Sequence, residues 1–179
     1  MNPARRDDVD DELVGSFWDY WAGLPRQGLI PSISDYLDRV PAKLQPAVAI
    51  IDAYSPTEFK VRLFGTALVE LLGKELTGGA PLDMYAEAFK AKACEVAWES
   101  ANRPCGYLCI RRYRNHAGVV VDAPGISLPV DGGRTHRQTM LNFTSLYGAQ
   151  SRKTDADGLD VIEALTVTAW IDVGAGIPS

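Results

Sequence analysis

Residues 59–78 read FKVRLFGTALVELLGKELTG, and the spacing of the apolar residues changes once within this stretch. In its first part apolar residues alternate with other side chains, which is the period-two pattern of a strand with one buried face (Phe59, Val61 and Leu63). Gly65 ends that strand, and from Thr66, the expected N-cap, the apolar spacing is helical. Gly73 is the expected C-cap because glycine enters the left-handed conformation freely. The stretch therefore predicts a strand that turns directly into a short helix.

Composition narrows the class of protein. The chain has 179 residues, which is enough for a single domain with a sizeable core. A formal net charge of −5 argues against a general nucleic-acid or anionic-membrane binder, because both need a basic surface. Three cysteines, an odd number, favour a reducing compartment, and no apolar run has the length of a signal core or a spanning helix. We therefore expect a cytoplasmic protein.

The pattern along the chain predicts four regions. They are a disordered leader (1–10), an N-terminal helical cap (11–45), a core (46–147) and a C-terminal extension with a loop and a candidate added strand (148–179). Within the core, a short apolar strand ends at Asp52, a long helix spans residues 83–102, and three strands follow (106–114, 119–130 and 138–147). Pro124 and Gly125 predict a bulge or bend in the second of these strands, because proline cannot donate to a ladder.

Four aromatic residues are concentrated on the predicted N-terminal amphipathic helix (Phe17, Trp18, Tyr20 and Trp21). This helix must bury its apolar face. Two partners for that face are open: the rest of the same domain, or a second copy of the chain. We take these four residues as the candidate dimer or partner face.

Several short motifs occur in one order over residues 17–147. They are Trp21 with Leu24, Leu29-Ile30-Pro31, Ile50-Ile51-Asp52, Val61-Arg62-Leu63-Phe64-Gly65-Thr66, Leu76-Thr77-Gly78, Leu128-Pro129-Val130 and Asp131-Gly132. The set resembles the PAS domain, and more narrowly a bacterial family of small stand-alone PAS proteins, the fifth PAS subfamily type. The resemblance implies an α+β fold in which a five-stranded antiparallel sheet is packed by one long helix and short helices. It also implies a sensory role, and N-terminal helices that often mediate dimers.

No cofactor is predicted. Haem-binding PAS domains usually take an axial histidine from the long helix, and residues 83–102 contain none. Flavin photosensors of this fold carry an Asn-Cys-Arg motif, which is absent from the sequence. Cys105 and Cys109 would lie about 13 Å apart on one strand, too far to share a metal or form a disulfide. His116 and His136 fall at predicted turns without a nucleophile beside them, so neither a catalytic nor a metal site is expected.

The chain's basic cluster lies on one predicted strand. Alternation sends Arg112 and Arg114 to one face and Arg111 to the other. One interpretation is a solvated strand, and the other is a surface for an anionic ligand or an acidic partner. Arg62, where the PAS resemblance places an arginine, is expected to pair with an acidic side chain such as Asp19 or Asp35.

In PAS domains the space between the long helix and the sheet holds a small molecule or is packed core, and both alternatives are open. The candidate lining residues are Phe59, Val61, Leu63, Tyr85, Phe89, Val96, Leu128, Leu141, Phe143 and Asn142. A pocket needs a few convergent polar groups among apolar walls. Tyr85, Thr139 and Asn142 are the polar candidates.

We therefore predict a non-enzymatic PAS sensory or adaptor module that acts through contacts with a signalling protein, with homodimerisation through its N-terminal helix. The first alternative is a sensor that binds a small apolar ligand between the long helix and the sheet. The second is a small α+β enzyme such as an isomerase, which would need a carboxylate inside the cavity. Neither nucleic acid nor a membrane is an expected partner.

Overall fold

The computed structural model describes residues 2–114, 118–133, 138–146 and 161–178. Within these residues six strands form one antiparallel sheet in the order β2-β1-β5-β4-β3-β6. The predicted α+β class is confirmed, with one strand more than the five expected. The strands are β1 (Val48–Ser55), β2 (Glu58–Phe64), β3 (Cys105–Arg114), β4 (Val120–Val130), β5 (Gln138–Thr144) and β6 (Val161–Asp172). The expected turns at His116 and His136 and the loop at 148–158 lie outside the described residues.

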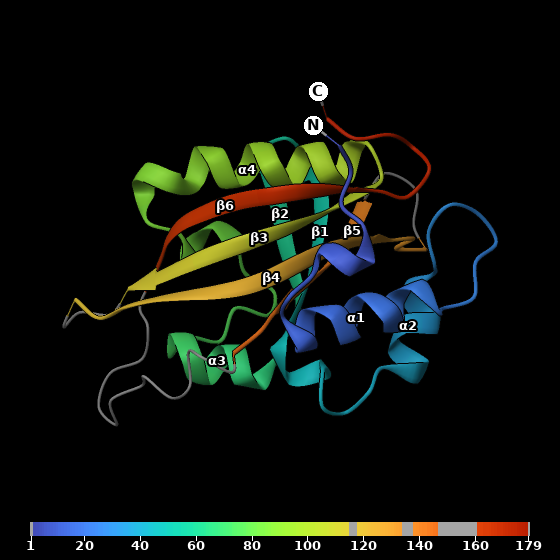
Figure 1. Ribbon diagram of the computed structural model, residues 1–179. Coiled ribbons are helices and arrows are strands. Elements are labelled where there is room, and N and C mark those ends of the chain that lie inside the picture. Colours follow the sequence, from blue (N-terminus) through green and yellow to red (C-terminus); the bar gives the residue numbers. More distant parts are fainter. Residues whose placement is uncertain (1, 115–117, 134–137, 147–160, 179) are drawn as a thin grey trace.

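Helices cover the sheet on both faces (Figure 1). Helix α4 (Glu87–Asn102) lies on the face that we call inner, together with α3 (Thr66–Leu72) and the 3₁₀ turn η3 (Pro81–Met84). Helices α1 (Glu12–Ala22) and α2 (Ile33–Arg39) cover the outer face. Two further 3₁₀ turns, η1 (Arg6–Asp8) and η2 (Gln45–Ala47), precede α1 and β1. The sheet therefore separates two hydrophobic cores.

The stretch at residues 59–78 folds largely as its pattern predicts. β2 ends at Phe64 and α3 begins at Thr66, with Gly65 rather than Thr66 as the N-cap. Gly73 is the C-cap in the left-handed conformation, with φ of 67°. A Cβ on Gly65 would collide with the backbone of Pro46, so the turn between strand and helix needs glycine.

One bulge changes the pattern of β2. Leu63 pairs with Ile50, but Val61 pairs with Ile51, so Arg62 is an extra residue on β2. The bulge lets Val61 pack in the inner core while Leu63 packs against the outer core. Strict alternation would have placed both residues on one face.

One expected helix boundary and one expected bulge are wrong. The long helix begins at Glu87 instead of residue 83, because Pro81–Met84 forms a separate 3₁₀ turn. β4 shows no bulge at Pro124 and Gly125, and its pairing with β3 continues without a register shift from Ser127 to Val120. Pro124 pairs with Ile110, and Gly125 with Cys109.

Candidate functional site

The candidate binding site lies on the inner face of β3. Alternate residues of this strand point to that face, and four of them are buried there: Tyr107, Cys109, Arg111 and Tyr113. Arg112 and Arg114 point to the opposite side, where they are exposed and pair with Asp122 and Glu163. The predicted separation of the three arginines is therefore confirmed. Arg111, however, is buried and not exposed to solvent.

The Arg111 side chain reaches across β4 to β5. It passes over Gly125, where a Cβ would collide with its guanidinium. Nη1 donates to the carbonyl oxygen of Phe143 and to Thr144 Oγ1, and Nη2 donates to Asn142 Oδ1, each over 3.3 Å. These bonds are longer than the 2.9–3.0 Å typical of N–H···O bonds. The missing side chain at Gly125 is thus what allows a guanidinium to lie inside this face of the sheet.

Arg111 is a buried cation whose partners are neutral. Its exposed fraction is 4%, and all three of its acceptors are amide, carbonyl or hydroxyl oxygens. No carboxylate forms an ion pair with it within the described ranges. Taking a cation out of water without a counter-charge is costly, since hydrogen bonds to neutral oxygens replace only part of its hydration.

A second buried group at the same place lacks a partner. Asn142 is 8% exposed and lies directly across from Arg111, but its Nδ2 finds no hydrogen-bond acceptor among the described residues. Leaving such a donor unpaired costs roughly 1–3 kcal/mol. Arg111 and Asn142 therefore present donors that the chain itself does not fully satisfy.

Two small hollows meet at these groups. Each has a volume of about 30 Å³ available to water-sized groups, and both are lined by Ile51, Tyr85 and Asn142. Arg111, Tyr113 and Thr144 line the first together with apolar residues of α3 and β1, and Phe59, Cys94 and Tyr107 line the second together with α4. One water needs about 10–15 Å³ by this measure, so each hollow accommodates about two small groups.

The phenols and thiols around Arg111 are uncharged at neutral pH. Burial raises the pKa of Tyr107 to about 12 and also raises the pKa of Tyr85 and Tyr113. Burial likewise raises the pKa of Cys109, so its thiol is protonated and unreactive. The positive charge of Arg111 is therefore not offset by these neighbours.

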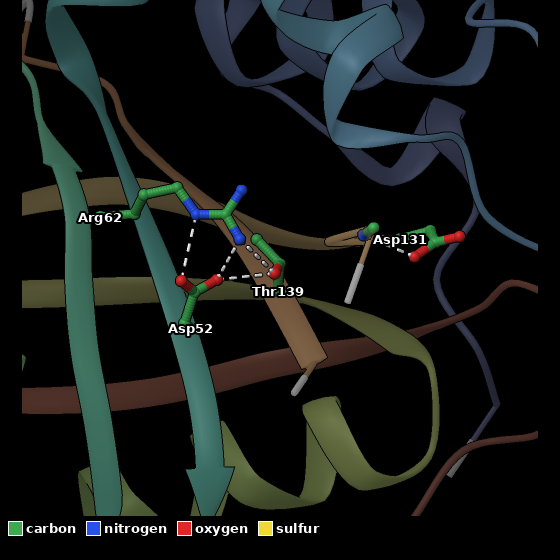
Figure 2. A network of polar contacts seen from close by, with 5 residues as sticks. Asp52, Arg62, Asp131 and Thr139 are labelled. Atoms are coloured by element: carbon green, nitrogen blue, oxygen red, sulfur yellow. Dashed lines mark hydrogen bonds and ion pairs between the residues drawn. The ribbon is translucent and has the colours of Figure 1, made fainter. Parts of the chain in front are cut away.

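The other arginine of interest, Arg62, is paired with a carboxylate. Its Nε and Nη2 donate to the two oxygens of Asp52 over 3.0 and 2.6 Å, and Nη2 also donates to Thr139 Oγ1 over 3.1 Å. Thr139 in turn donates to Asp52 over 2.7 Å. Figure 2 shows these three side chains pointing toward one another, while Asp131 points away from them. The predicted partners Asp19 and Asp35 are wrong, because Asp19 pairs with Arg6 and Asp35 accepts from Ser32.

A larger hollow lies elsewhere among the described residues. It is an open groove of about 560 Å³ over the connector between α1 and α2. Its charged residues have partners within the chain: Arg26 bonds three backbone carbonyls and covers the Trp21 ring, and Asp131 accepts from the backbone of Gly133. This groove is larger than the Arg111 hollows, but none of the described residues that line it has an unpartnered buried polar atom.

The structure brings some of the candidate lining residues together and separates others. Phe59, Tyr85 and Asn142 line the hollows. Val61 packs in the inner core, Val96 packs with Tyr107 and Cys109, and Phe89 is half-buried on α4. Four candidates lie on the outer face and do not line the hollows: Leu63, Leu128, Leu141 and Phe143. Leu63 changes face because of the bulge at Arg62, and the other three alternate with inward residues of β4 and β5.

The four aromatic residues proposed as a partner face are used within the chain. Phe17, Trp18 and Trp21 are buried, and Tyr20 is half-buried with its hydroxyl donating to the carbonyl of Tyr36. The Phe17 ring stacks on Phe143 with centroids 4.8 Å apart, and Trp21 Nε1 donates to the Pro129 carbonyl. The structure therefore packs these four side chains within the same domain, and a dimer or partner contact through this helix stays a prediction.

Sequence reasoning separated Arg111 from its neighbours but did not place it in the pocket. The signal was present, since a single arginine alternated with tyrosine and cysteine on the face opposite Arg112 and Arg114. The sequence does not show the space over Gly125, because Gly125 becomes a neighbour of Arg111 only when β3 and β4 pair.

Comparison with known protein families identifies the class. A family model described as the PAS domain matches residues 12–141, which is most of the chain. The chain therefore belongs to the PAS domain family, whose members are sensory and signalling modules. Neither the curated proteins nor the solved structures give a significant match. No helix within the described ranges is long and apolar enough to cross a membrane.

Proposed function

We propose that this PAS module is a sensor that binds a small molecule in the hollows around Arg111 and Asn142. The observation that carries the proposal is the buried pair of polar groups at that place. Among the described residues, the guanidinium is bonded only to neutral oxygens and the amide nitrogen has no acceptor. A packed core that served stability alone would gain by replacing both groups with apolar side chains. This favours the ligand-binding alternative over an adaptor with a filled interior.

The sensor acts without enzymatic chemistry. None of the described residues that line the hollows is the buried carboxylate that an isomerase would need, and Asp52 faces the outer layer, where it is paired with Arg62. The thiols are free and have raised pKa values, which fits a protein of the reducing cytoplasm. Ligand binding would favour one of two conformations, and a signalling protein would recognise that conformation at the surface.

The proposal is tested by asking what the protein carries from the cell. The full chain is purified in buffer free of small organic ions and denatured, and the filtrate is analysed by NMR, ion chromatography and mass spectrometry. We expect one compound at about one equivalent per chain. A filtrate without any compound, together with no thermal stabilisation by a library of small metabolites, would contradict the proposal.

A matched pair of variants tests the location. Ala49 lines the hollow at Arg111, whereas Ala53, on the same strand and in the same core, lines neither hollow. Both are almost fully buried, so Ala49→Val and Ala53→Val should each cost about 1–3 kcal/mol through overpacking. Only Ala49→Val should lose the bound compound. Equal retention by both variants would place the ligand elsewhere.

A further inference from the structure

We infer that the ligand is a small planar oxyanion, a short-chain carboxylate first of all, held by the guanidinium of Arg111 and the amide of Asn142. This inference rests on the proposed function, and it specifies the chemistry that the site recognises. It follows from charge, from the balance of donors and acceptors, and from volume.

Charge is the first argument. Arg111 keeps its proton at any physiological pH, and the residues around it are neutral tyrosines, a neutral thiol, an amide and a hydroxyl. A ligand with one negative charge would convert this isolated cation into a hydrogen-bonded ion pair. A cationic ligand would be repelled, and a doubly charged phosphate would leave one negative charge uncompensated in the same buried place.

The balance of donors is the second argument. The guanidinium and the Nδ2 of Asn142 are donors, and three tyrosines are among the residues that line one or both hollows (Tyr85, Tyr107 and Tyr113). Arg111 already uses nearby oxygens as acceptors, namely Asn142 Oδ1, Thr144 Oγ1 and the Phe143 carbonyl. The site therefore needs acceptors from the ligand. Two coplanar oxygens match the fixed fork of a guanidinium better than a single acceptor does.

Volume is the third argument. Each hollow offers about 30 Å³ to water-sized groups, and the two share Ile51, Tyr85 and Asn142 as lining. A ligand of three to five heavy atoms matches this space. A longer chain would have to displace α3 or η3, whose residues Leu68, Leu72 and Met84 form the apolar wall beside Arg111.

Direct binding tests the ligand class. Dialysed full-length protein is titrated with formate, acetate, propionate, nitrate, chloride and the neutral acetamide at constant ionic strength, by calorimetry and thermal shift. We expect acetate or formate to bind and to raise the Tm, and acetamide to do neither. Nitrate binding at similar strength would identify a general planar oxyanion site, and chloride binding alone would overturn the inference.

Variants assign the binding to Arg111. Arg111→Gln should weaken acetate binding by at least about tenfold, the effect of losing hydrogen bonds from a charged group. Arg112→Gln is the matched control, because Arg112 is the exposed neighbour that pairs with Asp122, and it should bind as wild type does. Equal binding by both variants would overturn the role of Arg111.

A second variant, Asn142→Asp, tests the same inference if Arg111→Gln fails to fold, because it places a negative charge beside Arg111 within the chain. Asn142→Asp is isosteric and would place a carboxylate at the atom that lies 3.3 Å from Arg111 Nη2. We expect the ligand-free Tm to rise by about 2–6 °C, and the response to acetate to disappear. A fall in Tm with an unchanged acetate response would overturn the inference.

The result also separates the inference from the proposed function. A neutral compound released stoichiometrically from the wild-type protein and lost in Ala49→Val would uphold the sensor and refute the oxyanion. The absence of both a released compound and any carboxylate response would refute both. Release of a carboxylate that Arg111→Gln no longer carries would support both.

Discussion

The two faces of the sheet treat their buried polar groups differently. On the outer face Arg62 is matched by the two oxygens of Asp52, and the buried indole of Trp21 has a carbonyl partner. On the inner face Arg111 has only neutral acceptors, and one donor of Asn142 has none among the described residues. The difference teaches that burial of a polar group does not by itself indicate a binding site. A buried polar group that lacks a hydrogen-bond partner or a counter-charge does indicate one.

Because the two cores differ in packing, truncating a phenylalanine to alanine should lower the free energy of unfolding by different amounts in each. Phe17→Ala removes a fully buried ring that stacks on Phe143, so we expect the free energy of unfolding to fall by about 4–5 kcal/mol. Phe59→Ala removes a ring beside an existing hollow, and we expect a loss of about 3 kcal/mol. Urea unfolding of both variants measures the difference. A larger loss at Phe59 would contradict the contrast between a closed outer core and a looser inner one.

Replacing the two arginines by methionine should change stability in opposite directions. Arg62→Met removes an ion pair from Asp52, whose side chain is 5% exposed, and we expect a loss of about 2–3 kcal/mol because Arg62 itself is partly exposed. Arg111→Met removes a buried cation that has no carboxylate partner among the described residues, so ligand-free protein should be unchanged or more stable by up to about 2 kcal/mol. Urea unfolding after exhaustive dialysis measures both. A loss at Arg111 as large as that at Arg62 would show that Arg111 is satisfied within the chain.

The space over Gly125 sharpens the comparison further. Gly125→Ala would press a methyl group against the guanidinium of Arg111 and the Phe143 carbonyl, and we expect a loss of about 1–3 kcal/mol together with weaker acetate binding. Gly28→Ala is the control, because a Cβ there meets no atom within 4 Å. Thermal unfolding with and without acetate gives both quantities. If Gly125→Ala responded to acetate as the wild type does, acetate binding would not depend on the Arg111 side chain passing over Gly125.

The smallest expected effect is that of pH. The titratable groups that face Arg111 are Tyr107, Cys109 and Tyr113 from β3 and Tyr85 from the segment before α4, and burial raises the pKa of each. All of them remain neutral between pH 6 and 8, so acetate affinity should be constant there. Below about pH 5 the ligand's own carboxylate takes up a proton and affinity should fall. Calorimetry at a series of pH values checks this, and a transition near pH 7 would indicate another titrating group.

Much of the fold could be predicted from local pattern. The change of period at Gly65 and the glycine C-cap at Gly73 depend on neighbours in sequence, and the structure has both. The bulge at Arg62 could not be predicted, because it exists only in the pairing of β2 with β1. Strict alternation predicts that Leu63 lines the pocket. The extra residue at Arg62 places Leu63 on the other face.

The candidate site was predictable only in part, for a reason of geometry. Alternation tells which residues of a strand share a face, but not which face receives the long helix. Asn142 alternates with Leu141 and Phe143, so these three could not all line one cavity. Pro124 and Gly125 predict a bulge or bend in β4, whereas the pairing with β3 has no register shift there and Gly125 makes room for Arg111.

Phe143 belongs to both layers of the molecule. Its carbonyl accepts from Arg111 on one side of β5, and its ring stacks on Phe17 of α1 on the other. If an anion drew the guanidinium away from that carbonyl, the peptide group of Phe143 would lose a partner and the ring attached to it would feel the change. The aromatic layer beneath α1 is therefore a natural optical reporter, through the near-ultraviolet dichroism of its rings and the fluorescence of Trp18 and Trp21, for an event on the opposite side of the sheet.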